Sequence, residues 1–230
     1  MPAASRPPAP ARVLATRMLR RIAASTVWLV VVLSVGAPSG AFGQTSAATS
    51  LRGPELLAAL RAGGYVLYFR HADTDHSQND QRMTSVDDCT TQRNLTDRGR
   101  DHARALGEAI RALGIPIGAV LASPLCRTVE TAMLAFGTAQ KAPAAREGGP
   151  LPPGSPGRFP ALRALLSTPV APGTNTVVVA HAYPYFSLVG GQFLSEGEAD
   201  VLRPRGGDFE VVARVGLRQW RELAATLAPR

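Results

Sequence analysis

Short hydrophobic runs alternate with longer stretches in which apolar residues recur every three or four positions. The runs "YVLYF" (65–69), "IGAVLAS" (117–123) and "NTVVVAH" (175–181) are rich in β-branched or aromatic residues and too short for helices, so they predict buried strands. The helical spacing occurs five times. The predicted helices cover residues 53–64, 95–114, 124–137, 158–167 and 216–227. Residues 199–204 and 209–215 predict two later strands, antiparallel neighbours near an edge.

This alternation of strands and helices predicts a three-layer α/β/α sandwich with a mostly parallel central sheet. In such sheets, ligands bind outside the carboxyl ends of the strands. The pairs Arg70-His71, Ser123-Pro124 and Ala180-His181 lie at the ends of three predicted strands. In the helix that follows Ser123, Arg127 lies about one turn in and can point back toward the same edge.

Arg70, His71, Arg127 and His181 together predict a cationic crevice. Two guanidinium groups and two imidazoles suit a tetrahedral dianion such as phosphate, because arginine matches phosphate oxygens with paired hydrogen bonds. Each residue alone has an ordinary structural explanation, such as a histidine satisfied at a strand end. All four at carboxyl strand ends favour a functional site.

Two long polar segments lack any period of their own. Residues 72–94 follow the first strand, and the Pro/Gly/Ala-rich residues 138–156 follow the third predicted helix. Loops of this length in a small domain are usually functional or disordered, so we expect a loop or lid near the crevice.

The N-terminus has the pattern of an export signal. Arginines precede the apolar stretch "IAASTVWLVVVLSVGA", and small residues then suit cleavage before Gln44. We therefore expect a Sec-type signal peptide at 1–43, a polar tether at 44–52 and a catalytic domain at 53–230. The mature protein would be periplasmic or secreted, without stable membrane insertion once the signal is cleaved.

The net charge of +8 changes little in this picture. Residues 1–43 hold five arginines and no acidic residue, and the remainder has 20 basic against 17 acidic residues. There is no run of Lys or Arg interleaved with aromatic residues, so nucleic acid is not an expected partner.

Cys89 and Cys126 are the two cysteines of the chain. In an oxidising compartment they could form a disulfide, and the alternative is two unrelated buried thiols. Neither spacing nor composition decides between them. They do not form a C-x-x-C pattern of a zinc or redox site.

A metal site is the competing interpretation of "HADTDH". His71, Asp73, Asp75 and His76 supply nitrogen and oxygen ligands within six residues, in a spacing near that of a zinc hydrolase signature. A metal centre would need further ligands. Only His102 and His181 remain as histidines, and His102 is expected on a helix surface, so this interpretation is the weaker one.

From residue 65 to about 186 the chain resembles the histidine phosphatase, or phosphoglycerate mutase-like, superfamily. The resemblance is carried in order by Arg70-His71, "LTDRGRDHARALGEAI", "SPLCRTVETA" and the late strand-terminal His181. It implies the fold of phosphoglycerate mutase and is strongest toward small bacterial members and their exported relatives. The chain departs from the family's Arg-His-Gly, because Ala72 follows His71 and could crowd the phosphate if a positive φ is required there.

The resemblance implies a metal-independent phosphatase without a cofactor. His71 would attack phosphorus and become a phosphohistidine, while Arg70, Arg127 and His181 would hold the phosphoryl oxygens. Asp73 is the preferred proton donor for the leaving group, with Glu147 and Glu198 as alternatives.

The substrate would be a phosphorylated small molecule or a phosphorylated component of the cell envelope. A catalytically inactive phosphate-binding protein of the same fold remains an alternative, and the sequence does not indicate an oligomeric state.

Overall fold

The computed structural model describes residues 50–146 and 159–227, which belong to one unit of the chain, Thr45–Arg230. The helices are α1 (Gly53–Ala62), α2 (Asp97–Ala112), α3 (Cys126–Phe136), α4 (Pro160–Ser167), α5 (Ala182–Val189) and α6 (Leu217–Ala225), with short 3₁₀ turns η1 (Cys89–Thr91) and η2 (Pro143–Ala145). The strands are β1 (Val66–Arg70), β2 (Ile117–Ala122), β3 (Gln140–Lys141), β4 (Asn175–Ala180), β5 (Ala199–Pro204) and β6 (Phe209–Val215). The expected signal peptide lies outside the described residues, and of the tether only residues 50–52 are described. No helix within the described ranges is long and apolar enough to cross a membrane.

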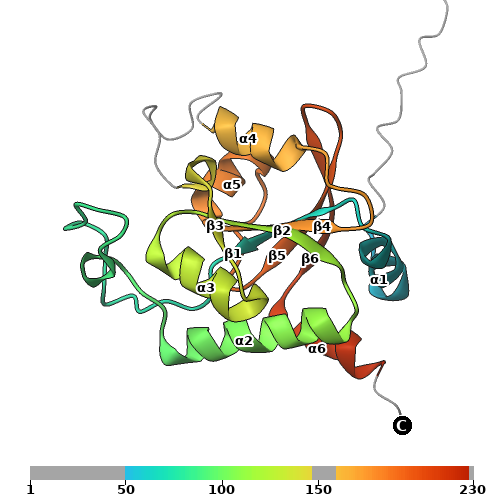
Figure 1. The fold of residues 1–230 in the computed structure, drawn as a ribbon, viewed down its shortest axis with the longest axis horizontal. Helices are drawn as coiled ribbons and strands as arrows, with labels where there is room; N and C mark the ends of the chain where they lie inside the picture. The colour runs from blue at the N-terminus through green and yellow to red at the C-terminus, as the bar shows by residue number, and fades with distance from the viewer. Residues whose placement is uncertain (1–49, 147–158, 228–230) are drawn as a thin grey trace, which may run out of the picture. The chain divides into compact units, whose positions relative to one another are not determined.

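The strands form one sheet in the order β3-β2-β4-β1-β5-β6 (Figure 1). β1 is parallel to β4, and β2 is parallel to both β3 and β4. β5 runs antiparallel to β1 and to β6. The sheet is therefore mostly parallel, as the sequence predicts, and the two late strands are the expected antiparallel neighbours beside one edge.

Helices cover both faces of the sheet and complete the three predicted layers. In Figure 1, α4 and α5 lie above the sheet, and α2, α3 and α6 lie below it. Because strand side chains alternate between faces, Leu67 and Phe69 of β1 belong to the core between the sheet and helices α2, α3 and α6. Val66 and Tyr68 belong to the core between the sheet and helices α4 and α5. This two-sided burial explains why β1 has a continuous hydrophobic sequence.

Two local expectations differ from the structure. Helix α3 begins at Cys126, two residues later than the position of Pro124 suggested, because Ser123 still donates a sheet-like hydrogen bond to the Val179 carbonyl (2.9 Å) and Leu125 is extended. The segment expected to be a loop from residue 138 begins with strand β3, whose two residues are both exposed. A two-residue edge strand leaves no hydrophobic alternation in the sequence, so the pattern could not reveal it.

Candidate active site

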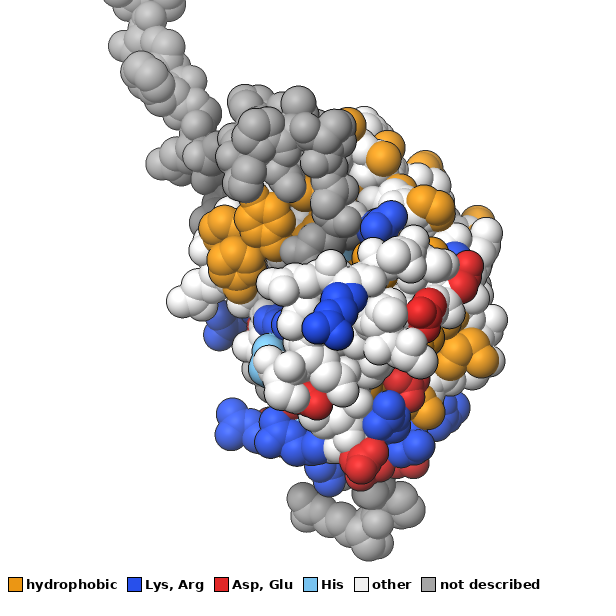
Figure 2. Space-filling model, turned by 90° about the vertical axis from the view of Figure 1, so that its left-hand side faces the viewer, with side chains coloured by type: hydrophobic (Ala, Val, Ile, Leu, Met, Phe, Trp, Pro, Cys, Tyr) orange, Lys and Arg blue, Asp and Glu red, His pale blue; other side chains and the backbone are white. Residues whose placement is uncertain are grey.

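The parallel pairing of β1 and β4 brings the two catalytic candidates His71 and His181 together. Arg70 is in register with Ala180, so the next residue of each strand lies at the same edge of the sheet. The two imidazole rings are 5.7 Å apart, with an angle of 62° between their planes. β2 adds Ser123, whose Oγ lies 2.8 Å from Nε2 of His181. Figure 2 looks onto this side of the molecule, on which basic, acidic and hydrophobic side chains are interspersed.

His71 has the state that a nucleophilic imidazole needs. Its Nδ1 lies 2.9 Å from the backbone oxygen of Ala72, and because a carbonyl only accepts, Nδ1 carries the hydrogen. The other nitrogen, Nε2, then keeps its lone pair. Burial lowers the pKa of His71 to about 3; the bond to Ala72 opposes this shift, and the charges of Arg127, Arg70 and Arg93 add to it. His71 is therefore neutral at physiological pH, with one nitrogen available.

His181 is equally buried and is fixed through its backbone. The Tyr68 hydroxyl donates to the His181 carbonyl (2.8 Å) and accepts from its backbone N–H (3.2 Å). Burial, followed by the charges of Arg127 and His71, holds the pKa of His181 well below its usual value. Among the described residues, Nδ1 of His181 has no hydrogen-bond partner.

Tyr68 is in turn supported from the neighbouring strands. Its ring stacks on Tyr185 (centroids 4.3 Å apart), whose hydroxyl donates to Asp200 on β5 (2.8 Å). Asp200 is buried and is bound by two guanidinium nitrogens of Arg214 on β6, at 2.7 and 2.9 Å. A buried polar network therefore extends from β6 to the backbone of His181.

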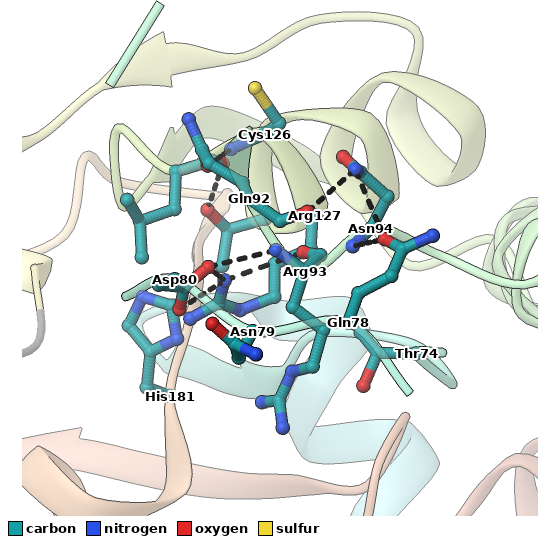
Figure 3. A network of polar contacts seen from close by, with 12 residues as sticks. Thr74, Gln78, Asn79, Asp80, Gln92, Arg93, Asn94, Cys126, Arg127 and His181 are labelled. Carbon is teal, nitrogen blue, oxygen red and sulfur yellow. Dashed lines mark hydrogen bonds and ion pairs between the residues drawn. The ribbon is translucent and has the colours of Figure 1, made fainter. Parts of the chain in front are cut away.

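The two arginines predicted for the site are held by different parts of the chain. Arg70 donates to the Leu194 carbonyl (2.8 Å) and to Glu196 (3.3 Å), both in the segment between α5 and β5. Arg127 is 1% exposed, and its Nη1 lies 3.1 and 3.0 Å from the two carboxylate oxygens of Asp80. The dashed lines in Figure 3 join Arg127 to the carboxylate of Asp80. The structure thus brings Arg70, His71, Arg127 and His181 to one edge of the sheet.

Three residues at this edge were not predicted as site residues. Glu196 binds Arg70 and Thr74, and its Oε1 is 4.0 Å from Nδ1 of His71. Arg93 is close enough for its charge to lower the pKa of both histidines, although burial is the main cause. Asp80 accepts from the Arg93 backbone N–H at 2.8 Å. Loop residues have no periodicity from which their direction can be read. The unusual length of segment 72–94 was the one sequence signal for Asp80 and Arg93, and Glu196, between α5 and β5, had none.

Asp73, the preferred proton donor, has other partners. Its two oxygens bind Arg98 (2.5 Å) and Nδ1 of His102 (2.7 Å) at the start of α2. Partial burial alone would raise the pKa of Asp73, but the hydrogen bonds from Arg98 and His102 lower it below its usual range. A carboxylate held ionised in this way is a poor acid, so the structure argues against Asp73 as the donor. The alternative Glu198 accepts from the Ser195 N–H (2.9 Å), and Glu147 lies outside the described residues.

The residues considered for a metal site do not gather as ligands. His71 is buried, whereas the side chain of His76 is 65% exposed and lies 3.5 Å from Glu196. Asp75 is exposed and binds the hydroxyl and backbone N–H of Ser77. Over residues 50–146 and 159–227, no group of three or more His, Cys, Asp or Glu side chains could hold a metal ion.

Ala72 is buried beside His71. Its backbone N–H donates to Thr131 Oγ1 (3.1 Å), and its side chain packs with Leu95 and Ala103 in a small buried cluster. The methyl group that replaces the usual glycine hydrogen is therefore accommodated by packing against α2.

Cys89 and Cys126 form a disulfide, which decides between the two alternatives left open by the sequence. The bond fastens segment 72–94 to the first residue of α3, next to Arg127. Gln92 reinforces the connection, because its side-chain oxygen accepts from the Cys126 N–H (2.9 Å) and its amide donates to the Val86 carbonyl (3.0 Å). The loop that carries Asp80 and Arg93 is thus covalently attached beside the site.

The two neutral histidines predict a loss of stability in weak acid. An unfolded histidine takes up a proton near pH 6.5, whereas folded His71 does so only near pH 3 and His181 well below its usual value. Protons therefore favour the unfolded chain below pH 6.5. From about pH 7.5 to 5.5, urea denaturation should show a loss of about 1 kcal/mol for each histidine.

In the variant His71→Asn, the free energy of unfolding should fall less between these pH values, because the contribution of His71 is gone. His76→Asn, at the exposed histidine, should leave the pH dependence unchanged. Equal pH dependence in His71→Asn and wild type would show that His71 is not held neutral.

The site lies at the carboxyl edge of a mostly parallel α/β/α sandwich, where two arginines and two histidines come together. The model of the histidine phosphatase superfamily (branch 1) matches residues 66–148. The matched region contains Arg70, His71 and Arg127, which carry part of the resemblance seen in the sequence.

Several solved structures are similar to this chain. Protein histidine phosphatase SixA, complexed with tungstate, is 21% identical, with a TM-score of 0.45 over 67% of this chain and 97% of that chain. TTHB049 from Thermus thermophilus is 21% identical, with a TM-score of 0.47 over 66% and 99%. A mycobacterial glucosyl-3-phosphoglycerate phosphatase with inorganic phosphate is 15% identical, with a TM-score of 0.47 over 68% and 99%. No curated protein matches the chain.

Proposed function

We propose that the protein hydrolyses phosphate monoesters or phosphohistidine through a covalent phosphohistidine at His71. The match of residues 66–148 to the histidine phosphatase superfamily (branch 1) supports phosphatase activity. The observation that carries the proposal is the state of His71, with its Nδ1 bonded to the Ala72 carbonyl and its Nε2 lone pair retained beside Arg70 and Arg127.

In the proposed reaction, Arg70, Arg127 and His181 bind the phosphoryl oxygens while Nε2 of His71 attacks phosphorus. The ester bond breaks, and the phosphoryl group is carried on the imidazole. Water then attacks phosphorus, the P–N bond breaks and inorganic phosphate is released with neutral His71 regenerated. None of these steps requires a metal ion or a cofactor.

We further propose that the protein acts outside the cytoplasm on a phosphorylated small molecule or a phosphorylated component of the cell envelope. Support comes from the export-signal pattern of residues 1–43 and from the disulfide, a bond that persists in oxidising compartments.

Trapping of the phosphoenzyme tests the mechanism. Wild-type protein mixed with a ³²P-labelled monoester should retain label after alkaline denaturation and lose it in acid, since phosphohistidine is stable to base and labile to acid. The label should map to the peptide containing His71, and it should be absent in His71→Asn but present in His76→Asn.

Two results would reject the proposal. Turnover without label, abolished by EDTA, would favour the metal-dependent hydrolase. Binding of inorganic phosphate without turnover in wild type would favour the inactive binding protein.

A further inference from the structure

Asp80 forms an ion pair with Arg127, one of the arginines proposed to bind the phosphoryl oxygens. Both of its carboxylate oxygens lie within 3.1 Å of Arg127 Nη1, and one also accepts from the Arg93 N–H at 2.8 Å. Arg127 is almost fully buried, whereas the Asp80 side chain is 31% exposed, so the carboxylate lies on the solvent side of the guanidinium. A phosphate dianion that binds Arg127 must therefore displace this carboxylate.

The other acidic side chains near the site in the described residues are already engaged. Asp73 is held ionised by Arg98 and His102. Glu196 accepts from Arg70 and Thr74 and lies on the Nδ1 side of His71, away from the attacking nitrogen. Glu198 accepts from Ser195 at the turn before β5. Asp80 is paired with Arg127, a group that the substrate would bind, and unlike Glu196 it does not lie on the Nδ1 side of His71.

We propose that Asp80 is the proton donor to the leaving oxygen, and that it lies on Arg127 until the phosphoryl group of the substrate displaces it. This inference rests on the proposed function and supplies its missing acid. A phosphate monoester near neutral pH still includes a monoanionic form, because its second ionisation lies near pH 6. The monoanion binds Arg127 and transfers its proton to the displaced carboxylate.

The proton balance closes over both steps. As the P–N bond to His71 forms, the P–O bond of the ester breaks and the Asp80 proton moves to the leaving oxygen, which departs as a neutral alcohol. Asp80, now ionised, accepts a proton from the attacking water as the P–N bond breaks. Inorganic phosphate departs as the monoanion with that proton, and the Asp80 carboxylate returns to Arg127.

The test compares a good leaving group with a poor one. For wild type and Asp80→Asn, kcat/KM is measured with p-nitrophenyl phosphate and with glycerol phosphate, whose alcohol needs a proton to depart. Binding effects of the lost charge are common to both substrates, so their ratio isolates proton donation. We expect Asp80→Asn to raise the ratio in favour of p-nitrophenyl phosphate by about 100-fold, the lower end of the usual range for general-acid catalysis.

Control variants define the outcomes. Asp87→Asn, in the same loop but exposed and paired with Lys141, should leave the ratio unchanged. An unchanged ratio in Asp80→Asn, or the same rise in Glu147→Gln alone, would overturn the acid role. If wild type turns over neither substrate, the proposed function and the acid role fail together.

The displacement itself has a separate readout that does not need turnover. Calorimetric titration with inorganic phosphate at about pH 7.5 should show roughly tenfold tighter binding to Asp80→Asn than to wild type, because the competing carboxylate is gone. Equal affinities would show that Asp80 does not compete for Arg127.

Discussion

Replacement of His71 by asparagine should lower kcat/KM for p-nitrophenyl phosphate by about 10⁴-fold or more, the order of loss seen when an enzyme loses its nucleophile. Asparagine preserves polarity and approximate size but offers no imidazole lone pair to phosphorus. The effect should be on chemistry rather than on binding. Arg70, Arg127 and His181 remain, so the variant should still bind inorganic phosphate within a few-fold of wild type.

The matched control is His76→Asn, at an exposed histidine five positions along the chain. It should retain activity within about threefold, since substitutions of exposed side chains usually have small effects. Residual activity of several per cent in His71→Asn, with normal phosphate binding and folding, would assign the nucleophile elsewhere.

Removal of the disulfide should lower the free energy of unfolding by about 4 kcal/mol. Cys89 and Cys126 are 37 residues apart, and a crosslink closing a loop of that length restricts the unfolded chain by about this amount. The measurement is urea denaturation of the Cys89→Ser/Cys126→Ser protein beside wild type. Reduced wild type should match the double variant, and dithiothreitol should not affect the variant.

The disulfide should also affect the site, because it holds the loop that carries Asp80 and Arg93 next to Arg127. The double variant should bind inorganic phosphate more weakly than wild type under conditions in which both remain folded. Identical denaturation midpoints with and without reductant, or two free thiols in oxidised protein, would contradict the prediction.

The backbone frame of the site could be predicted from the sequence, because buried parallel strands bring their carboxyl ends to one edge. That rule places His71, Ser123 and His181 together without any alignment, and the helical turn after Ser123 adds Arg127. The partners of these residues could not be predicted in the same way. Asp80 and Glu196 lie in segments whose conformations are set by tertiary contacts, such as the Asp80–Arg127 pair, and not by local periodicity.

Asp73 illustrates the limit of reasoning from sequence distance. Its position two residues beyond His71 predicted reach to a leaving group, yet the chain turns after Ala72 so that the Asp73 carbonyl accepts from the Thr96 N–H (3.0 Å) at the start of α2. The side chain follows the backbone toward Arg98 and His102. Proximity along the chain could not reveal this change of direction.

The contact between Asp200 and Arg214 constrains how this protein can diverge. A buried carboxylate that loses its guanidinium partner destabilises a fold by about 3–5 kcal/mol, whereas a neutral pair of similar volume is tolerated. Substitutions at the two positions should therefore be coupled, so that related sequences carry both charges or neither. This pair supports Tyr185, which stacks on Tyr68, and Tyr68 binds the backbone of His181. The constraint that holds His181 in place therefore extends to residues on β5 and β6.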